Sequence, residues 1–132
     1  IDGKEVWFLP GGSVDWGETI KDAAVREAKE ELGIDVIPTQ LIGVSDAISP
    51  NKDFHSIELI FKCNYVGHPI PNGEIPDTNE ITENKYGIAG RWFTIDEIAN
   101  FNAYPKLFLT KKLPALINGN EIIETYIGLD WD

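Results

Sequence analysis

The stretch of sequence that decides the fold runs from Gly12 to Ile34 and reads GSVDWGETIKDAAVREAKEELGI. Five residues separate Gly12 from Glu18, and seven more precede an arginine that is followed by three closely spaced glutamates. On a helix, residues three and four apart share one face, where like charges repel by a few tenths of a kcal/mol per pair. A divalent cation removes this repulsion, and oxygen ligands favour Mg²⁺, with Mn²⁺ as a substitute. The arginine is Arg26, and the glutamates are Glu27, Glu30 and Glu31.

The same stretch predicts a helix with defined ends. Thr19 can accept a hydrogen bond from the backbone of Asp22, and Gly33 suits a left-handed cap after the last turn. Before the helix, Gly11 and Gly12 allow a close approach of the backbone to another group. The expected buried stripe of the helix consists of Ile20, Ala23, Ala24, Ala28 and Leu32.

The pattern resembles the box of the Nudix hydrolase (MutT-like) family, with Ala28 where a larger aliphatic residue is usual. The resemblance implies an α/β (α+β) fold, an α/β/α sandwich with a mixed, partly antiparallel sheet. We expect one domain over residues 1–132. The resemblance is strongest from Trp7 to Ile34 and weakens through Ile98. It also implies one or two strands before the box, although only eleven residues precede Gly12. Either the chain lacks N-terminal strand residues, or another element, such as the C-terminal strand, takes their place.

By resemblance, the box residues bind metal and hydrolyse a diphosphate linkage. The implied ligands and supporting groups are the carbonyl of Gly11 and the carboxylates of Glu18, Glu27, Glu30 and Glu31. Arg26 orients a metal-binding glutamate in this reading. Its alternative role is a surface ion pair with Glu30.

The general base has two kinds of candidate. Glu27 is one, and a glutamate of the loop after the box is the other, with Glu83 and Glu80 in the right part of the chain. The substrate class is a nucleoside diphosphate joined to a group X: a nucleoside triphosphate, modified nucleotide, nucleotide sugar or dinucleoside polyphosphate. Two alternatives have no such activity. One is a catalytically silent nucleotide-sensing module, and the other is an isoprenoid diphosphate isomerase, which would need Cys63 near its site.

Length, net charge and cysteine content narrow the range of expected binding partners and locations. The chain has 132 residues and a net charge of −11, which argues against a nucleic-acid partner but not against a metal-bound polyphosphate. No apolar run is long enough to span a membrane. The single cysteine predicts a reducing, cytoplasmic location, and a homodimer is left open. We interpret His55 and His68 as ordinary surface or loop residues.

The remaining sequence predicts further strands and helices. The aromatics Trp7, Phe8, Trp92 and Phe93 are expected in the core, whereas Trp16, Phe54 and Tyr86 are weaker candidates for stacking on a base. Strands are expected at 5–9, 36–44 (one or two around Pro38), 56–66 (central, covered on both faces), 88–93 and 121–129. Loops are expected at 45–54 and 67–85, and a turn at 118–120. Helices are expected from Thr94 towards Phe101 and from Pro105 to before Pro114.

Overall fold

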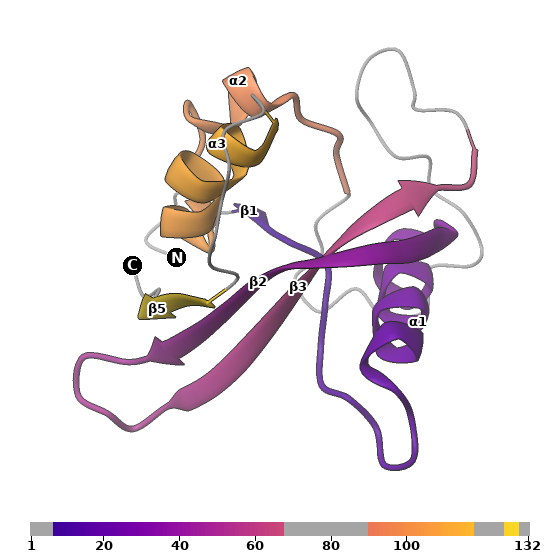
Figure 1. The fold of residues 1–132 in the computed structure, drawn as a ribbon, viewed down its shortest axis with the longest axis horizontal. Helices are drawn as coiled ribbons and strands as arrows, with labels where there is room; N and C mark the ends of the chain where they lie inside the picture. Colours follow the sequence, from indigo (N-terminus) through magenta and orange to yellow (C-terminus); the bar gives the residue numbers. More distant parts are fainter. Residues whose placement is uncertain (1–6, 68–89, 118–125, 130–132) are drawn as a thin grey trace. The chain divides into compact units, whose positions relative to one another are not determined.

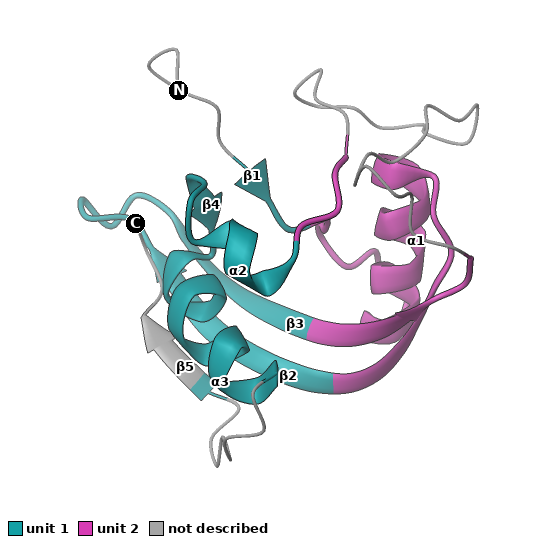
Figure 2. Cartoon of the chain, turned by 90° about the horizontal axis from the view of Figure 1, so that it is seen from above, with its two compact units in different colours: residues 1–9, 41–60, 94–132 teal, residues 10–40, 61–93 magenta. Residues whose placement is uncertain are grey.

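A computed structural model describes residues 7–67, 90–117 and 126–129 (Figure 1). These residues form two compact units, coloured separately in Figure 2. Unit 1 contains residues 1–9, 41–60 and 94–132, and unit 2 contains residues 10–40 and 61–93. That residues 1–132 are a single domain stays a prediction. The elements are β1 (Trp7–Phe8), α1 (Ile20–Leu32), β2 (Val36–Ile48), β3 (His55–Tyr65), α2 (Ile95–Ile98), β4 (Ala103–Tyr104), η1 (Phe108–Lys112), α3 (Leu113–Ile117) and β5 (Tyr126–Leu129).

Helix α1 of unit 2 begins and ends as its sequence predicts. Thr19 Oγ1 accepts a hydrogen bond of 3.1 Å from the backbone N–H of Asp22. At the other end Gly33 has a φ of 66°, and its N–H donates to the carbonyl of Lys29 at 2.9 Å. A side chain is disfavoured at this φ, which explains the glycine after the last turn.

The expected buried stripe of α1 is partly wrong. Ala23 and Ala28 are buried, but Ile20 is 42 % exposed and Glu27 is only 5 % exposed. Ile20 belongs to the first turn, where the neighbouring Thr19 and Lys21 are exposed as well, so this turn extends beyond the packed part of the helix. A carboxylate therefore occupies a position that the apolar pattern alone would not assign to the interior.

Strand β2 is longer than its sequence suggests. It continues through Pro38 to Ile48 as one element, so the loop expected from Ser45 was wrong for residues 45–48. Ser45 and Ala47 lie on the same side of β2, and both are buried. These small residues at alternate positions explain why the strand extends through the predicted loop. The connection to β3 starts at Ser49, whose N–H donates to the carbonyl of Phe54 at 3.0 Å.

Strand β3 is at an edge among the described strands, not central as expected. The order in this sheet is β3-β2-β5, because the C-terminal strand β5 pairs in parallel with β2, with Val44 opposite Tyr126. The arrows of β2 and β3 point in opposite directions in Figure 1, so the sheet is mixed. Ile57 of β3 is 68 % exposed, and it shares an exposed face with His55 and Leu59. The predicted α/β class with mixed sheets is confirmed.

The core of unit 1 forms around a second, two-stranded sheet. Strands β1 and β4 pair in parallel, with Trp7 opposite Ala103 and Phe8 opposite Tyr104. Phe108 is 1 % exposed and forms the core with Ala103 and Leu109. Phe8 was wrongly expected in the core, since it is 55 % exposed. Packed against the core are Trp7, Ile42, Ile60, Ile98 and Leu113.

Two further expectations for residues 88–117 were wrong. Residues 92 and 93 form no strand and Arg91 makes only an isolated bridge, because ring contacts hold this segment: Trp92 lies 5.0 Å from Tyr65, centroid to centroid. The helical segment passes Pro114 to Ile117. A π-turn precedes the proline, with Leu113 N–H donating to the carbonyl of Phe108, and the wider turn relieves the clash that proline causes in an α-helix.

The N-cap of α2 expected at Thr94 is confirmed, because Thr94 Oγ1 accepts a hydrogen bond of 3.2 Å from Glu97 N–H. Of the strand expected at 121–129, residues 126–129 form β5. The expectations for 5–6, 68–89, 118–120 and 121–125, including Glu80, Glu83, His68 and Tyr86, lie outside the described residues. Within the described residues, no helix is long and apolar enough to cross a membrane.

Candidate active site

Arg26 connects the carboxylates of the candidate site. Its Nε and Nη2 each donate a hydrogen bond of 2.9 Å to the carboxylate of Glu18. Its Nη1 donates to Glu27 at 2.9 Å and to Glu30 at 3.1 Å. Nη2 also donates to the carbonyl of Ser13 at 2.9 Å. One planar guanidinium therefore fixes three carboxylates and the glycine-rich loop together, a use of arginine that lysine cannot reproduce.

This network lowers the pKa of Glu18. The hydrogen bonds from Arg26 and a backbone hydrogen bond from Asp15 stabilise the carboxylate and bring the pKa to about 2. The same contacts raise the pKa of Arg26 above its ordinary value, with the Glu18 hydrogen bond as the largest cause. Both groups are thus held in their charged forms at neutral pH.

The loop before α1 is closed by a turn that the sequence analysis did not identify. Glu18 N–H donates to the carbonyl of Asp15 at 3.1 Å, and Asp15 N–H donates to Glu18 Oε1 at 2.9 Å. Gly17, inside this turn, has a φ of 82°. The three-residue spacing of Asp15 and Glu18 with an intervening glycine is the signal that could have predicted it.

Glu27 is a buried carboxylate with an unused oxygen. Its Oε1 accepts from Arg26, whereas Oε2 has no hydrogen-bond partner among the described residues. The carboxylate lies against the backbone of Gly12: a Cβ at that position would be 2.5 Å from Cδ of Glu27 and 2.8 Å from Oε2. Glycine is therefore required at position 12 for this close approach. A buried, unpaired carboxylate oxygen is costly unless a cation or donor satisfies it.

Glu31 also contacts the glycine-rich loop. Its Oε1 accepts a hydrogen bond of 3.1 Å from the backbone N–H of Gly11. The contact joins the last turn of α1 to the residue whose carbonyl is an expected metal ligand. Gly11 and Gly12 thus bring the backbone of the loop to two different glutamates of α1.

The residues suit a hard divalent cation by their chemistry. The candidate ligands are all oxygens, as Mg²⁺ requires, and the unpartnered Oε2 of Glu27 is available to a cation. Within residues 7–67, 90–117 and 126–129, no three His, Cys, Asp or Glu side chains are gathered closely enough to hold a metal ion.

A second polar cluster, in unit 1, was not predicted. His55 is exposed, as expected, but its Nε2 lies 3.0 Å from Asp46 Oδ1, and the hydroxyl of Tyr126 donates a short hydrogen bond to Asp46 Oδ2. These contacts lower the pKa of Asp46, and the Asp46 carboxylate raises the pKa of Tyr126. No spacing signal links residues 46, 55 and 126, which strand pairing alone brings together.

The comparisons with known proteins agree with the family that the box indicates. Residues 1–111 match the family model of the NUDIX domain. The chain belongs to the Nudix family, and the resemblance seen in its sequence is confirmed. No solved structure was found to match it.

Three curated relatives illustrate the range of the family around this chain. An ADP-ribose pyrophosphatase of Methanocaldococcus jannaschii is 38 % identical over 73 residues, which cover 54 % of this chain and 42 % of the relative. An NAD-capped RNA hydrolase, NudC, of Stutzerimonas stutzeri is 33 % identical over 97 residues, which cover 69 % of this chain and 30 % of the relative. An uncharacterized Nudix hydrolase, YvcI, of Bacillus subtilis is 29 % identical over 99 residues, which cover 75 % of this chain and 58 % of the relative. The chain thus spans less than two thirds of each of these relatives.

Proposed function

We propose that this chain hydrolyses a diphosphate linkage in a nucleoside diphosphate-X substrate, with Mg²⁺ as cofactor and Mn²⁺ as substitute. The observation that carries the proposal is the buried carboxylate of Glu27, which lies against Gly12, is held by Arg26 and keeps one oxygen without a hydrogen-bond partner among the described residues. A helix stabilised only by packing has no reason to bury a carboxylate in this way. The same site supports activity over the silent sensing module, because all three glutamates of the box are present.

The names of two relatives narrow the range of candidate substrates. One is a pyrophosphatase of ADP-ribose and another a hydrolase of NAD-capped RNA. Both ADP-ribose and NAD contain adenosine joined through a diphosphate to a second ribose. Molecules with this adenosine diphosphoribose unit are therefore the first candidates for the substrate. Nucleoside triphosphates, modified nucleotides, nucleotide sugars and dinucleoside polyphosphates complete the panel to be tested.

Each residue of the site has a proposed role. Glu27, Glu30, Glu31 and the carbonyl of Gly11 would hold the metal. When bound, the metal supplies a water of lowered pKa and neutralises charge on the phosphate oxygens. Arg26 positions Glu27 and Glu30, and Glu18 fixes Arg26 through two parallel hydrogen bonds.

The proton of the attacking water needs an acceptor. Glu27 is suited to this role by the free Oε2 of its fixed carboxylate. A loop glutamate, Glu83 or Glu80, is the alternative, and separate substitutions distinguish them. Three further properties stay predictions: a small-molecule partner, a cytoplasmic location and the possibility of a homodimer.

The test is phosphate or nucleotide release from the substrate panel with Mg²⁺, Mn²⁺ or EDTA. Wild type is measured beside Glu31→Gln, which removes a ligand charge and keeps the shape of the side chain. Glu97→Gln on α2 is the matched control. We expect metal-dependent turnover that Glu31→Gln loses by at least about 100-fold while its melting temperature stays near wild type.

Two outcomes would contradict the proposal. Near-normal turnover by Glu31→Gln with metal present would refute the ligand assignment. No turnover of any panel member, combined with a rise in melting temperature on adding one of them, would establish the sensing module instead.

A further inference from the structure

One segment of this acidic chain carries only positive charge. Residues 98–120 contain three lysines and no aspartate or glutamate, whereas the rest of the sequence has eight Lys and Arg against 22 Asp and Glu. The lysines are Lys106, Lys111 and Lys112. In the part of the chain that the structure describes, none of their ammonium groups forms an ion pair with a carboxylate. The segment is thus locally positive, although the net charge of the whole chain is −11.

Two of these lysines are close together in the chain: Lys106 lies just before the π-turn η1, and Lys111 lies within it. Lys106, Thr110 and Lys111 are exposed, whereas Phe108 and Leu109 are buried in the core. Thr110 Oγ1 donates to the carbonyl of Lys106 at 2.7 Å, which connects the two turns that carry the lysines.

One member of an aromatic pair in unit 1 lies close to Lys106 along the chain. Phe8 of β1 stacks on Tyr104 of β4, with ring centroids 5.8 Å apart and an interplanar angle of 24°. Phe8 keeps 55 % of its surface exposed. Tyr104 is two residues before Lys106, so their Cα atoms are at most about 7 Å apart. Unit 1 therefore carries an exposed aromatic ring stacked on Tyr104, two residues before a lysine that has no carboxylate partner among the described residues.

We propose that Phe8, Tyr104, Lys106, Thr110 and Lys111 form a binding surface for single-stranded nucleic acid. Such ligands bind where aromatic side chains stack on bases and cations follow the phosphate backbone. The surface fits a membrane less well, because Phe108 and Leu109 of the same turn are buried and cannot insert into lipid. The inference goes beyond the proposed hydrolysis and revises the expectation that net charge excludes nucleic acid, because binding depends on local charge.

The test measures binding in EDTA, so it is independent of turnover. Fluorescence anisotropy follows a labelled oligouridylate of about a dozen nucleotides, with an oligothymidylate of equal length to separate RNA from DNA. We expect salt-sensitive binding that Lys106→Ala/Lys111→Ala weakens at least about tenfold. Loss of two phosphate contacts should also reduce the slope of log K against log salt by about 1.4. Phe8→Leu, which removes the ring and keeps an apolar side chain, should weaken binding at least about fivefold.

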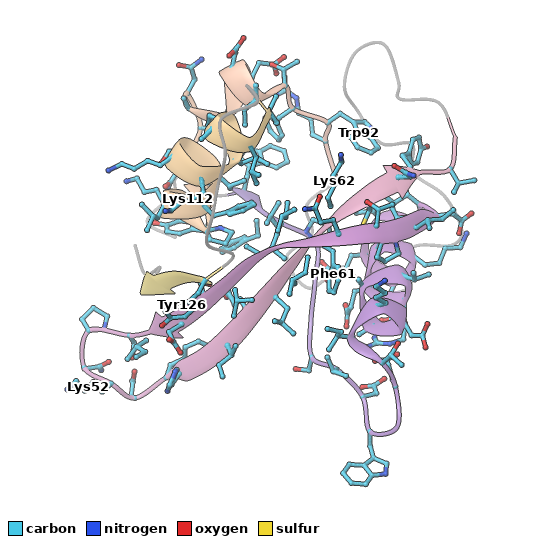
Figure 3. All side chains as sticks on the ribbon, in the orientation of Figure 1. Lys52, Phe61, Lys62, Trp92, Lys112 and Tyr126 are labelled. Atoms are coloured by element: carbon cyan, nitrogen blue, oxygen red, sulfur yellow. The ribbon has the colours of Figure 1, made fainter. Side chains whose placement is uncertain are left out.

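The control is Lys52→Ala/Lys62→Ala, which removes the same charge from two exposed lysines elsewhere, one in the loop after β2 and one on β3 (Figure 3). Thermal melting confirms that each variant is folded. An equal loss of binding in this control would overturn the proposal, as would no binding by wild type at low salt. Binding to phosphatidylserine vesicles but not to either oligonucleotide would overturn it in favour of a membrane surface.

Discussion

The carboxylate of Glu18 accepts two parallel hydrogen bonds from Arg26, one from Nε and one from Nη2, each 2.9 Å long. This fork leaves Nη1 free to contact Glu27 and Glu30. Of the two readings of Arg26, the structure therefore favours a positioning role over a simple surface pair with Glu30. Glu18 orients the arginine, and the arginine orients the glutamates that we propose as metal ligands.

Replacing Arg26 by lysine should remove this positioning while keeping the charge. A single ammonium cannot satisfy Glu18, Glu27 and the carbonyl of Ser13 together. We expect kcat/KM to fall about 10- to 100-fold, in the range found when partners of metal ligands are removed. Steady-state kinetics with saturating Mg²⁺ measures the effect. The control is the reverse exchange at an exposed position of the same helix, Lys21→Arg, which should keep wild-type activity; an equal loss there would contradict the positioning role.

The close approach of Gly12 to Glu27 gives a second prediction. In Gly12→Ala the new Cβ would lie 2.5 Å from Cδ of Glu27, so the flexible carboxylate must move while the backbone can stay. We expect Mg²⁺ affinity, measured by isothermal titration calorimetry, to fall at least about tenfold with little change in melting temperature. Gly11→Ala is the comparison, because a Cβ there meets nothing within 4 Å and its backbone carbonyl is retained. Equal losses in both variants would show that loop flexibility, and not the contact with Glu27, is responsible.

The lowered pKa of Glu18 predicts a specific pH dependence of stability. Folding lowers this pKa from 4.5 to about 2, chiefly through the hydrogen bonds from Arg26. A carboxyl with a depressed pKa stabilises the fold above its unfolded pKa, and this contribution is lost as the pH falls from about 4.5 through about 2. Glu18→Gln cannot titrate at this position. The melting temperature of wild type should therefore exceed that of the variant by the largest amount at about pH 6, and the difference should shrink towards pH 2. A difference that does not change with pH would refute the assigned cause.

The identity of the general base leads to a paired experiment on the segment of sequence that follows β3. Glu80→Gln and Glu83→Gln are made separately, and kcat is measured across pH for each. If a loop glutamate accepts the proton, one variant should lose about 10²- to 10⁴-fold in kcat and the other little. Two small effects would assign the role to Glu27.

The local features of the chain were predictable because neighbouring residues decide them. The caps at Thr19, Gly33 and Thr94 depend on contacts within one helical turn, and all three were confirmed. The grouping of Glu27, Glu30 and Glu31 on one face follows from helical geometry alone. The family also followed from sequence, because the spacing of the box is itself the signature.

The features that failed depend on partners distant in sequence. The last residues of β2 pair with β5, which is about 80 residues further along the chain, and the order β3-β2-β5 leaves β3 at an edge among the described strands. The continuation of the helical segment past Pro114 is an exception, because it depends on a local π-turn in which Leu113 N–H donates to the carbonyl of Phe108.

The sequence by itself determined the family, the capped helix and the presence of three carboxylates beside two glycines. Only the tertiary structure decided which carboxylate is buried and what holds it: Glu27 packs on Gly12, Glu31 binds Gly11, and Arg26 joins Glu18 to the rest. The physical reason is that burial and hydrogen bonding depend on where the loop folds back onto the helix. Periodicity assigns a residue to a face, but the approach of another segment decides whether that face is closed to water.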